Sequence, residues 1–122
     1  MSAAAYDAAQ GQIAVTVPEY GTERLALHVG NVEDLRFAAS RVTGFAWHPT
    51  DPSAIAWVEE SADGFALLQA DVSDGAITAT QITVLQDTVR PVAWGPWGYA
   101  LQGENGLTTI DPSGATVATA DV

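Results

Sequence analysis

Turn-forming residues recur along this chain of 122 residues at a regular interval, and that interval limits the folds the chain can adopt. Gly21, Gly64 and Gly106 each end a short turn sequence, and they are spaced by about 42 residues. Asp63-Gly64 and Asn105-Gly106 are strong hairpin signals, because Asp, Asn and Gly tolerate the positive φ of a type I′ turn. This periodicity predicts a fold built from similar hairpin-containing units in series.

Between these turns the sequence has the pattern of short antiparallel strands. Apolar residues alternate with polar ones or form short runs, β-branched residues are plentiful, and Gly, Pro, Asn and Asp interrupt the runs. Residues 31–39 also have a helix-like pattern that could form a single turn, too short to be stable alone. The predicted strands, four to a repeat, are Ala3–Tyr6, Gln12–Val17, Glu23–Val29 and Leu35–Ser40; Val42–Trp47, Ala54–Glu60, Phe65–Asp71 and Ala76–Leu85; and Pro91–Trp94, Tyr99–Gln102, Leu107–Ile110 and Ala115–Asp121.

The clearest copy of the repeated unit lies in residues 44–59. A strand ends in Trp47, a His-Pro-Thr-Asp-Pro-Ser turn follows, and the next strand, residues 54–58, is apolar throughout. A continuous apolar run of this length is typical of a strand that is buried on both faces. Weaker copies of the unit lie at residues 5–15 and 92–101.

Residues 47–57 resemble the Trp-Ser-Pro-Asp-Gly-x-x-Ile-Ala-Phe signature of TolB-like and WD40-like β-propeller repeats. The Trp, Pro, Asp and Ile-Ala-aromatic positions match, although the turn is longer and lacks the Gly. The Trp-Asp dipeptide that closes a WD40 repeat is absent, so the TolB-like group is the nearer match. The resemblance implies an all-β fold of three four-stranded antiparallel propeller-type blades, which is half or a fragment of a β-propeller. It would be a single domain over residues 1–122, with repeats at about 1–40, 41–89 and 90–122.

Three blades do not close a ring, because closed propellers typically have four to eight. The chain would then belong to a longer propeller, combine with a second copy into a six-bladed ring, or curl into a compact open stack. An open stack would expose two apolar blade faces to water. We therefore expect the isolated chain to self-associate or to contact missing blades, which a measurement of its mass in solution tests.

Composition limits the partners. Fifteen acidic residues stand against four arginines and no lysine, giving a formal charge of −11, which repels nucleic acid and anionic lipid headgroups. We therefore expect no nucleic-acid partner. No apolar run approaches the roughly 18 residues of a membrane span, so we also expect no membrane insertion of this segment. The first five residues have no basic n-region or apolar core and do not resemble a signal peptide. Disulfides and thiolate metal sites are excluded, because the chain has no cysteine.

The sequence contains no recognisable catalytic motif. Gly-x-Ser-x-Gly and Gly-rich phosphate loops are absent, and the two histidines, His28 and His48, lie far apart in the chain. Residues 71–75 have only part of a calcium-loop pattern, and a hairpin turn explains them better. We predict no catalytic residue, no cofactor and no metal.

Four residues are candidates for binding a partner: Trp97, Trp94, Tyr99 and His48. Exposed aromatic side chains bind peptides, sugars or partner chains, but Trp94 and Tyr99 could instead pack between blades. His48, with Asp51 near it, could be a metal ligand or a general base, or a turn residue bonded to the backbone.

Arg41 and Arg90 both directly precede the first strand of a repeat. We expect each of them to pair with a neighbouring carboxylate at a blade edge, which is a structural role.

These features predict a non-enzymatic scaffold or protein-binding domain, whose partner is another protein or a second copy of the chain. The TolB-like resemblance favours an extracytoplasmic or membrane-attached parent protein over a cytoplasmic one. The alternative is a fragment of a propeller-containing hydrolase or of a carbohydrate-binding propeller, whose active residues lie outside this chain.

Overall fold

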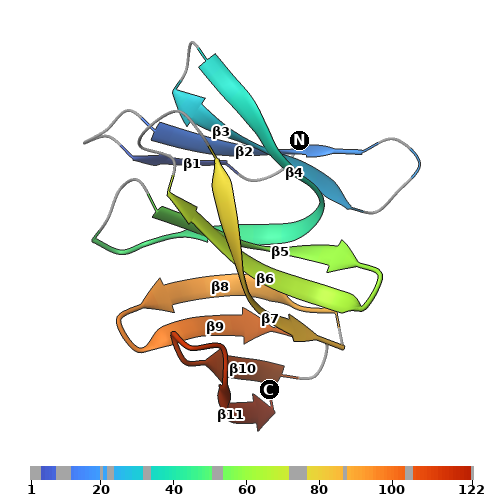
Figure 1. Cartoon of the computed structure of the whole chain (residues 1–122), viewed down its shortest axis with the longest axis vertical. Coiled ribbons are helices and arrows are strands. Elements are labelled where there is room, and N and C mark those ends of the chain that lie inside the picture. Colours follow the sequence, from blue (N-terminus) through green and yellow to red (C-terminus); the bar gives the residue numbers. More distant parts are fainter. Residues whose placement is uncertain are drawn as a thin grey trace.

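The computed structural model describes residues 4–7, 12–19, 21, 24–31, 34–50, 54–71, 77–86, 88–103 and 106–121. Every element in these ranges is a β-strand, and every strand pairing is antiparallel, in two sheets (Figure 1). The first sheet contains, in spatial order, β1 (Ala4–Asp7), β2 (Gln12–Pro18), β3 (Leu25–Asn31), β4 (Asp34–Trp47), β5 (Ala54–Ser61), β6 (Gly64–Asp71) and β7 (Thr78–Leu85). The second contains β8 (Arg90–Gly95), β9 (Gly98–Gln102), β10 (Gly106–Ile110) and β11 (Thr116–Asp121).

The all-β antiparallel prediction is confirmed, and the strands of the third repeat form a four-stranded sheet of their own. The strands of the first two repeats do not form two separate sheets, because the predicted strands 35–40 and 42–47 are joined in the single long strand β4. The helical turn considered for residues 31–39 is wrong for Asn31 and residues 34–39, which are strand. Pairing of these residues between β3 and β4 outweighs a helical tendency too short to persist alone.

Several predicted turn features lie outside the described residues: Asp51, residues 72–75 and Asn105. The hairpin predicted at Asp63-Gly64 is described and confirmed, but its type I′ geometry is not, because residues 62 and 63 form the turn and Asp63 does not have positive φ. It joins β5 to β6, with Ser61 opposite Gly64, and Gly64 has a φ of +138°.

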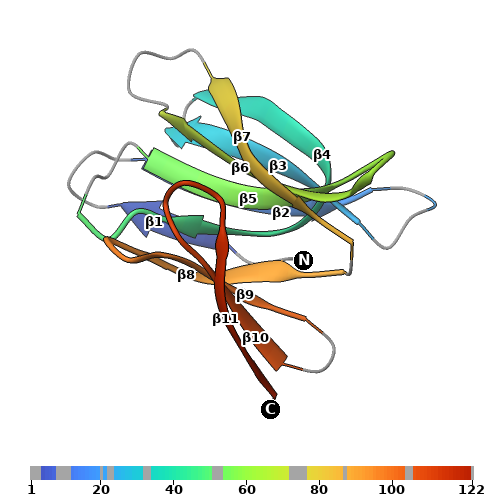
Figure 2. The same cartoon turned by 60° about the horizontal axis from the view of Figure 1, so that its bottom comes forward.

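A corner in β4 divides the first sheet. Residues up to Val42 pair with β3, and those from Val42 onward pair with β5, with shifts of register on both sides. Arg41 lies at the corner with a φ of +58°, a value that non-glycine residues adopt rarely. Figures 1 and 2 show β4 curving there, which places β5 and β6 across from β2 and β3.

Two hydrophobic clusters fill the spaces on either side of β5 and β6. The first cluster contains Ala14, Leu27, Val29, Ala39, Val42, Ile55, Trp57 and Ala70. The second contains Ala56, Val58, Phe65, Leu67, Val89, Tyr99, Leu101 and Ile110. Successive side chains of a strand point to opposite faces. In β5, therefore, Ile55 and Trp57 enter the first cluster, whereas Ala56 and Val58 enter the second. The prediction that this strand is buried on both faces is confirmed.

Replacing Val58 with alanine tests this double burial. The Val58 side chain is fully buried in the second cluster, so Val58→Ala should lower the free energy of unfolding by about 1.5–3 kcal/mol. Val117→Ala is the matched control, because Val117 is 64% exposed and its truncation should cost under about 0.5 kcal/mol. Urea unfolding followed by tryptophan fluorescence measures both changes, and equal losses would contradict the two-sided core.

Candidate binding site

Two of the candidate aromatic residues pack together between the sheets. Trp94 in β8 lies opposite Tyr99 in β9, and their rings stack with centroids 5.3 Å apart. Tyr99 is only 2% exposed, and its hydroxyl donates a hydrogen bond of 2.7 Å to Oε1 of Gln69 in β6. Burial raises the pKa of the Tyr99 phenol, which therefore stays protonated as the donor. The structure thus places Tyr99, with Trp94 against it, at the contact between β6 and the second sheet.

His48 closes the turn after β4. Its backbone N–H donates to the Ala54 carbonyl at 2.9 Å, and its Nδ1 accepts from the Thr50 N–H at 3.1 Å. Because Nδ1 accepts, the proton of the neutral ring lies on Nε2. The ring meets Trp94 edge-on, with centroids 4.7 Å apart. His48 is therefore a turn histidine bonded to backbone; Asp51, proposed as its companion, lies outside the described residues.

A groove of about 410 Å³ lies beside this pair of rings. It is lined by His48, Ala54, Gln69, Ala70, Asp71, Thr78, Thr80 and Trp94. Two of the lining residues are aromatic, two are alanines, and the other four, from β6 and β7, are amide, hydroxyl or carboxylate residues. Such a mixture can hold a flat apolar group and fix its orientation by hydrogen bonds. Sequence reasoning missed the residues from β6 and β7, since only strand pairing brings them to His48 and Trp94.

Trp97 lies on a different face from the other three candidates. It sits in the turn between β8 and β9 and is 52% exposed. Its indole lies over Gly95, where an added Cβ would meet Nε1 at 2.5 Å. Gly95 follows Trp94 in the strand, so its Cβ direction is toward the opposite face of the sheet. The four candidates therefore divide into the half-buried His48 and Trp94 beside the groove, the buried Tyr99 behind Trp94, and the exposed Trp97 on the outer face of the second sheet.

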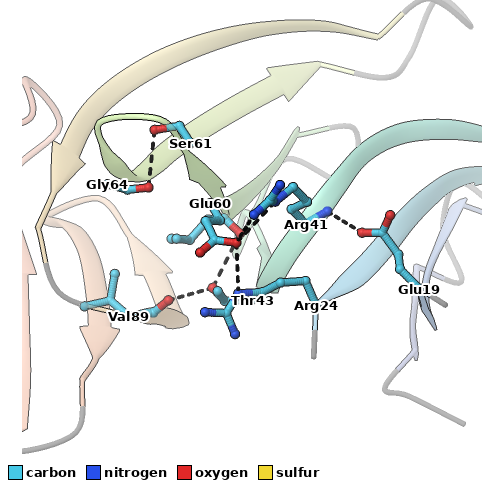
Figure 3. A network of polar contacts seen from close by, with 9 residues as sticks. Glu19, Arg24, Arg41, Thr43, Glu60, Ser61, Gly64 and Val89 are labelled. Atoms are coloured by element: carbon cyan, nitrogen blue, oxygen red, sulfur yellow. Dashed lines mark hydrogen bonds and ion pairs between the residues drawn. The ribbon is translucent and has the colours of Figure 1, made fainter. Parts of the chain in front are cut away.

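A polar network holds the opposite ends of the strands, near the corner of β4 (Figure 3). The Arg41 guanidinium binds Glu60, with 2.6 Å between Nη2 and Oε1, and its backbone N–H donates to Glu19. The hydrogen bond from Arg41 and its charge lower the pKa of the Glu60 carboxyl. Arg24 approaches the same Glu60 oxygen, with its Nε 3.9 Å away. The predicted pairing of Arg41 with a carboxylate is confirmed.

Arg90 has a different partner from the one predicted. Its Nη2 donates to the Gln102 side-chain oxygen at 2.8 Å, so the expected carboxylate is replaced by an amide from the neighbouring strand. Arg24 and Arg90 also line a second cavity, of about 250 Å³, together with Thr43 and Thr88. Thr43 ties the two sheets together there, because its hydroxyl donates to the Val89 carbonyl at 2.6 Å.

A scan against models of known protein families finds no match, and neither does a search of curated proteins. Within the described ranges, no group of three or more histidine or acidic residues is placed to hold a metal ion. The same part of the chain contains no helix with the length and apolarity needed to cross a membrane.

Gly98 controls the hairpin that carries Trp97. It has a φ of +124°, and a Cβ there would lie 1.9 Å from the Ile110 carbonyl oxygen. Gly98→Ala should therefore lower the free energy of unfolding by about 3 kcal/mol or more. Gly21→Ala is the control, because Gly21 also has positive φ but has nothing within 4 Å, so about 1 kcal/mol is expected. Equal losses in urea unfolding would show that the contact with Ile110 is not made.

Glu60→Gln tests the ion pair with Arg41 through its dependence on pH. The pKa of Glu60 is lowered from its ordinary value of 4.5, so the pair contributes stability that is fully present above pH 4.5. That contribution is lost as the pH falls through the lowered pKa of the folded state. We expect Glu60→Gln to lower the urea concentration at the midpoint of unfolding at pH 7. Below the lowered pKa of Glu60, the variant and the wild type should have the same midpoint. Asp63→Asn is the control, since it removes one exposed turn carboxylate outside the ion pair. A difference in urea midpoint between Glu60→Gln and the wild type that persists unchanged on acidification would contradict the ion pair.

Proposed function

We propose that this chain is a non-enzymatic protein-binding domain built from propeller-type units in series, with Trp97 as the principal anchor for its partner. The observation that carries the proposal is an exposed tryptophan held on a short hairpin over Gly95. Tryptophan is among the residues that contribute most at protein interfaces, because it buries a large area with few rotatable bonds. The β8–β9 hairpin is fixed by residues in the second cluster, so the Trp97 side chain loses little conformational entropy when it binds a partner.

Three four-stranded units are our interpretation of the two sheets. The corner in β4 separates β1–β3 and the first half of β4 from its second half and β5–β7, and β8–β11 make the third unit. Similar positions recur in similar surroundings: Trp47 packs against the first cluster and Trp94 against the second. This recurrence supports propeller-type units, and the resemblance to TolB-like repeats supports an extracytoplasmic or membrane-attached parent protein.

The geometry around His48 supports binding rather than catalysis. Its Nδ1 is engaged by the Thr50 N–H and its ring packs on Trp94, so the imidazole is positioned as part of the turn. The groove beside it offers hydrogen-bonding groups to a polar segment of a partner. Such groups fix the orientation of a bound segment, on a surface separate from the one that carries Trp97.

Photocrosslinking in cells of the source organism tests the proposal. A chain carrying p-benzoylphenylalanine in place of Trp97 should give a discrete crosslinked species that contains one other polypeptide, because position 97 lies in the interface. The same amino acid in place of Gln86 is the control. Gln86 is exposed and follows β7, at the ends of the strands away from the turn that carries Trp97 (Figure 1).

Mass spectrometry identifies the crosslinked polypeptide. An adduct from position 97 that is absent from position 86 supports the proposal. No adduct from position 97, or the same adducts from both positions, would refute Trp97 as an anchor.

A further inference from the structure

The first sheet has an apolar outer face at its β1–β4 end. Strand register places Ile13, Val15 and Val17 of β2 on one face with His28 of β3 and with Leu35 and Phe37 of β4. This set, called here the leading face, points away from the first cluster, and neither hydrophobic cluster contains any of its members. Phe37 is 60% exposed, and Val17 and Leu35 are also exposed. Large apolar side chains gathered on an exposed sheet face indicate a docking surface.

The chain itself shows what packs against such a face. Ile13, Ala14 and Val15 occupy the same places in their repeat as Ile55, Ala56 and Trp57 in the next repeat and Tyr99, Ala100 and Leu101 in the third. In the second repeat the large residues of this triplet pack toward the preceding strands, in the cluster that contains Ala14. In the third repeat they pack toward β5, in the cluster that contains Ala56.

The rule in both internal contacts is the same: the large residues of one triplet meet the face of the preceding unit that carries the small alanine of its own triplet. Ile13 and Val15 of the leading face are the large residues that have no such preceding unit among the described strands. The remaining alanine is Ala100, at the other end of the molecule.

Ala100 lies on the outer face of the second sheet. Register places Ala93, Ala100, Thr109 and Ala118 together there, and Trp97 covers Gly95 on the same face. This set is called here the trailing face. Its residues are mostly small, with Leu107 farther along β10 on the same face, so it offers a shallow surface beside the large ring of Trp97. The leading face instead offers projecting Ile, Val and Phe side chains.

Charge also restricts where two copies can meet. The chain has a formal charge of −11, so two copies repel one another at most orientations. Among the described side chains, the leading face has no acidic residue, and neither does the trailing face, which has Arg90 and Gln102 at its end. These two faces are therefore surfaces on which copies can approach without placing carboxylates against carboxylates.

We propose that a second copy of this chain docks head to tail, with its trailing face, including Trp97, on the leading face of the first copy, including Phe37. Resting on the proposed function, this identifies the partner that Trp97 anchors. Repeating the contact with the roles exchanged closes two copies into a ring of six units, within the four to eight that closed propellers contain. Docking of two leading faces would instead place large side chains against large side chains.

Sedimentation velocity over a range of concentrations tests the docking. The wild type should have twice the mass of the chain. Phe37→Glu and Trp97→Glu each spoil one face, and each alone should lower the association constant about 30-fold or more. An equimolar mixture of the two variants should associate more tightly than either alone, because the intact trailing face of one meets the intact leading face of the other. Gln86→Glu, off both faces, should associate like the wild type.

Leu35→Glu repeats the test on the leading face and Ala93→Glu repeats it on the trailing face. If circular dichroism shows that one variant has not folded, the other variant of the same face is used in its place. A monomeric wild type, a variant of either face that still dimerises like the wild type, or a mixture no tighter than its components would overturn head-to-tail docking. If the chain is monomeric while position 97 crosslinks to a different protein, the proposed function stands and this inference fails. If neither a dimer nor a crosslink forms, both fail.

Discussion

The structure depends on burying both faces of β5 and β6. Apolar side chains leave both sides of β5, so neither side can face water without a large loss of hydrophobic stabilisation. A sheet buried on one side only would have alternated apolar and polar residues. The chain instead supplies β2, β3 and the start of β4 for one side and β8–β10 for the other. The order of layers follows from this one strand pair.

The corner at Arg41 makes that arrangement possible within a continuous strand. A non-glycine residue with positive φ costs about 1–2 kcal/mol relative to ordinary backbone. The cost falls where the backbone N–H of Arg41 binds Glu19 and its side chain binds Glu60, so the contacts of the network oppose the strain. Thr43, two residues further on, bonds the Val89 carbonyl and fixes the second sheet to the same corner. The ends of the strands at the corner are thus held by polar groups, and their opposite ends by the aromatic residues around Trp94.

Much of the strand pattern was predictable because it rests on local signals. Alternation and turn residues located the strands, and Asp63-Gly64 located a hairpin, in which Gly64 but not Asp63 takes the positive φ that the type I′ prediction assigned to both. The continuity of β4 was not predictable. The strand continues through a corner where Arg41 has positive φ, and arginine is not a residue type that favours positive φ. The helical turn at residues 31–39 was wrong because strand pairing with β3 is a contact that no local window contains.

The candidate site was predictable only in part, for the same reason. The sequence identified His48, Trp94, Tyr99 and Trp97 as a group, since three of them are neighbours in one short segment. Neighbouring residues of a strand face opposite sides of the sheet, so the side of Gly95 that Trp97 covers is opposite to the side on which the Trp94 ring lies. This alternation separates Trp97 from the other candidates. Gln69, which bonds the Tyr99 hydroxyl, is thirty residues away in the chain and carries no motif.

The separation of Trp97 from the groove has a consequence for how the domain binds. The groove opens where β6 and β7 meet the rings of His48 and Trp94, whereas Trp97 covers the far side of the second sheet. A molecule on the trailing face therefore leaves the groove residues uncovered, and a molecule in the groove leaves Trp97 exposed. Trp94 and Tyr99 pack in or against the second cluster, between the groove and the trailing face. A change to either of them therefore disturbs both surfaces, whereas a change to Trp97 disturbs the trailing face alone. Substitutions at Trp97 are consequently the ones whose effects on binding can be interpreted without a change in the core.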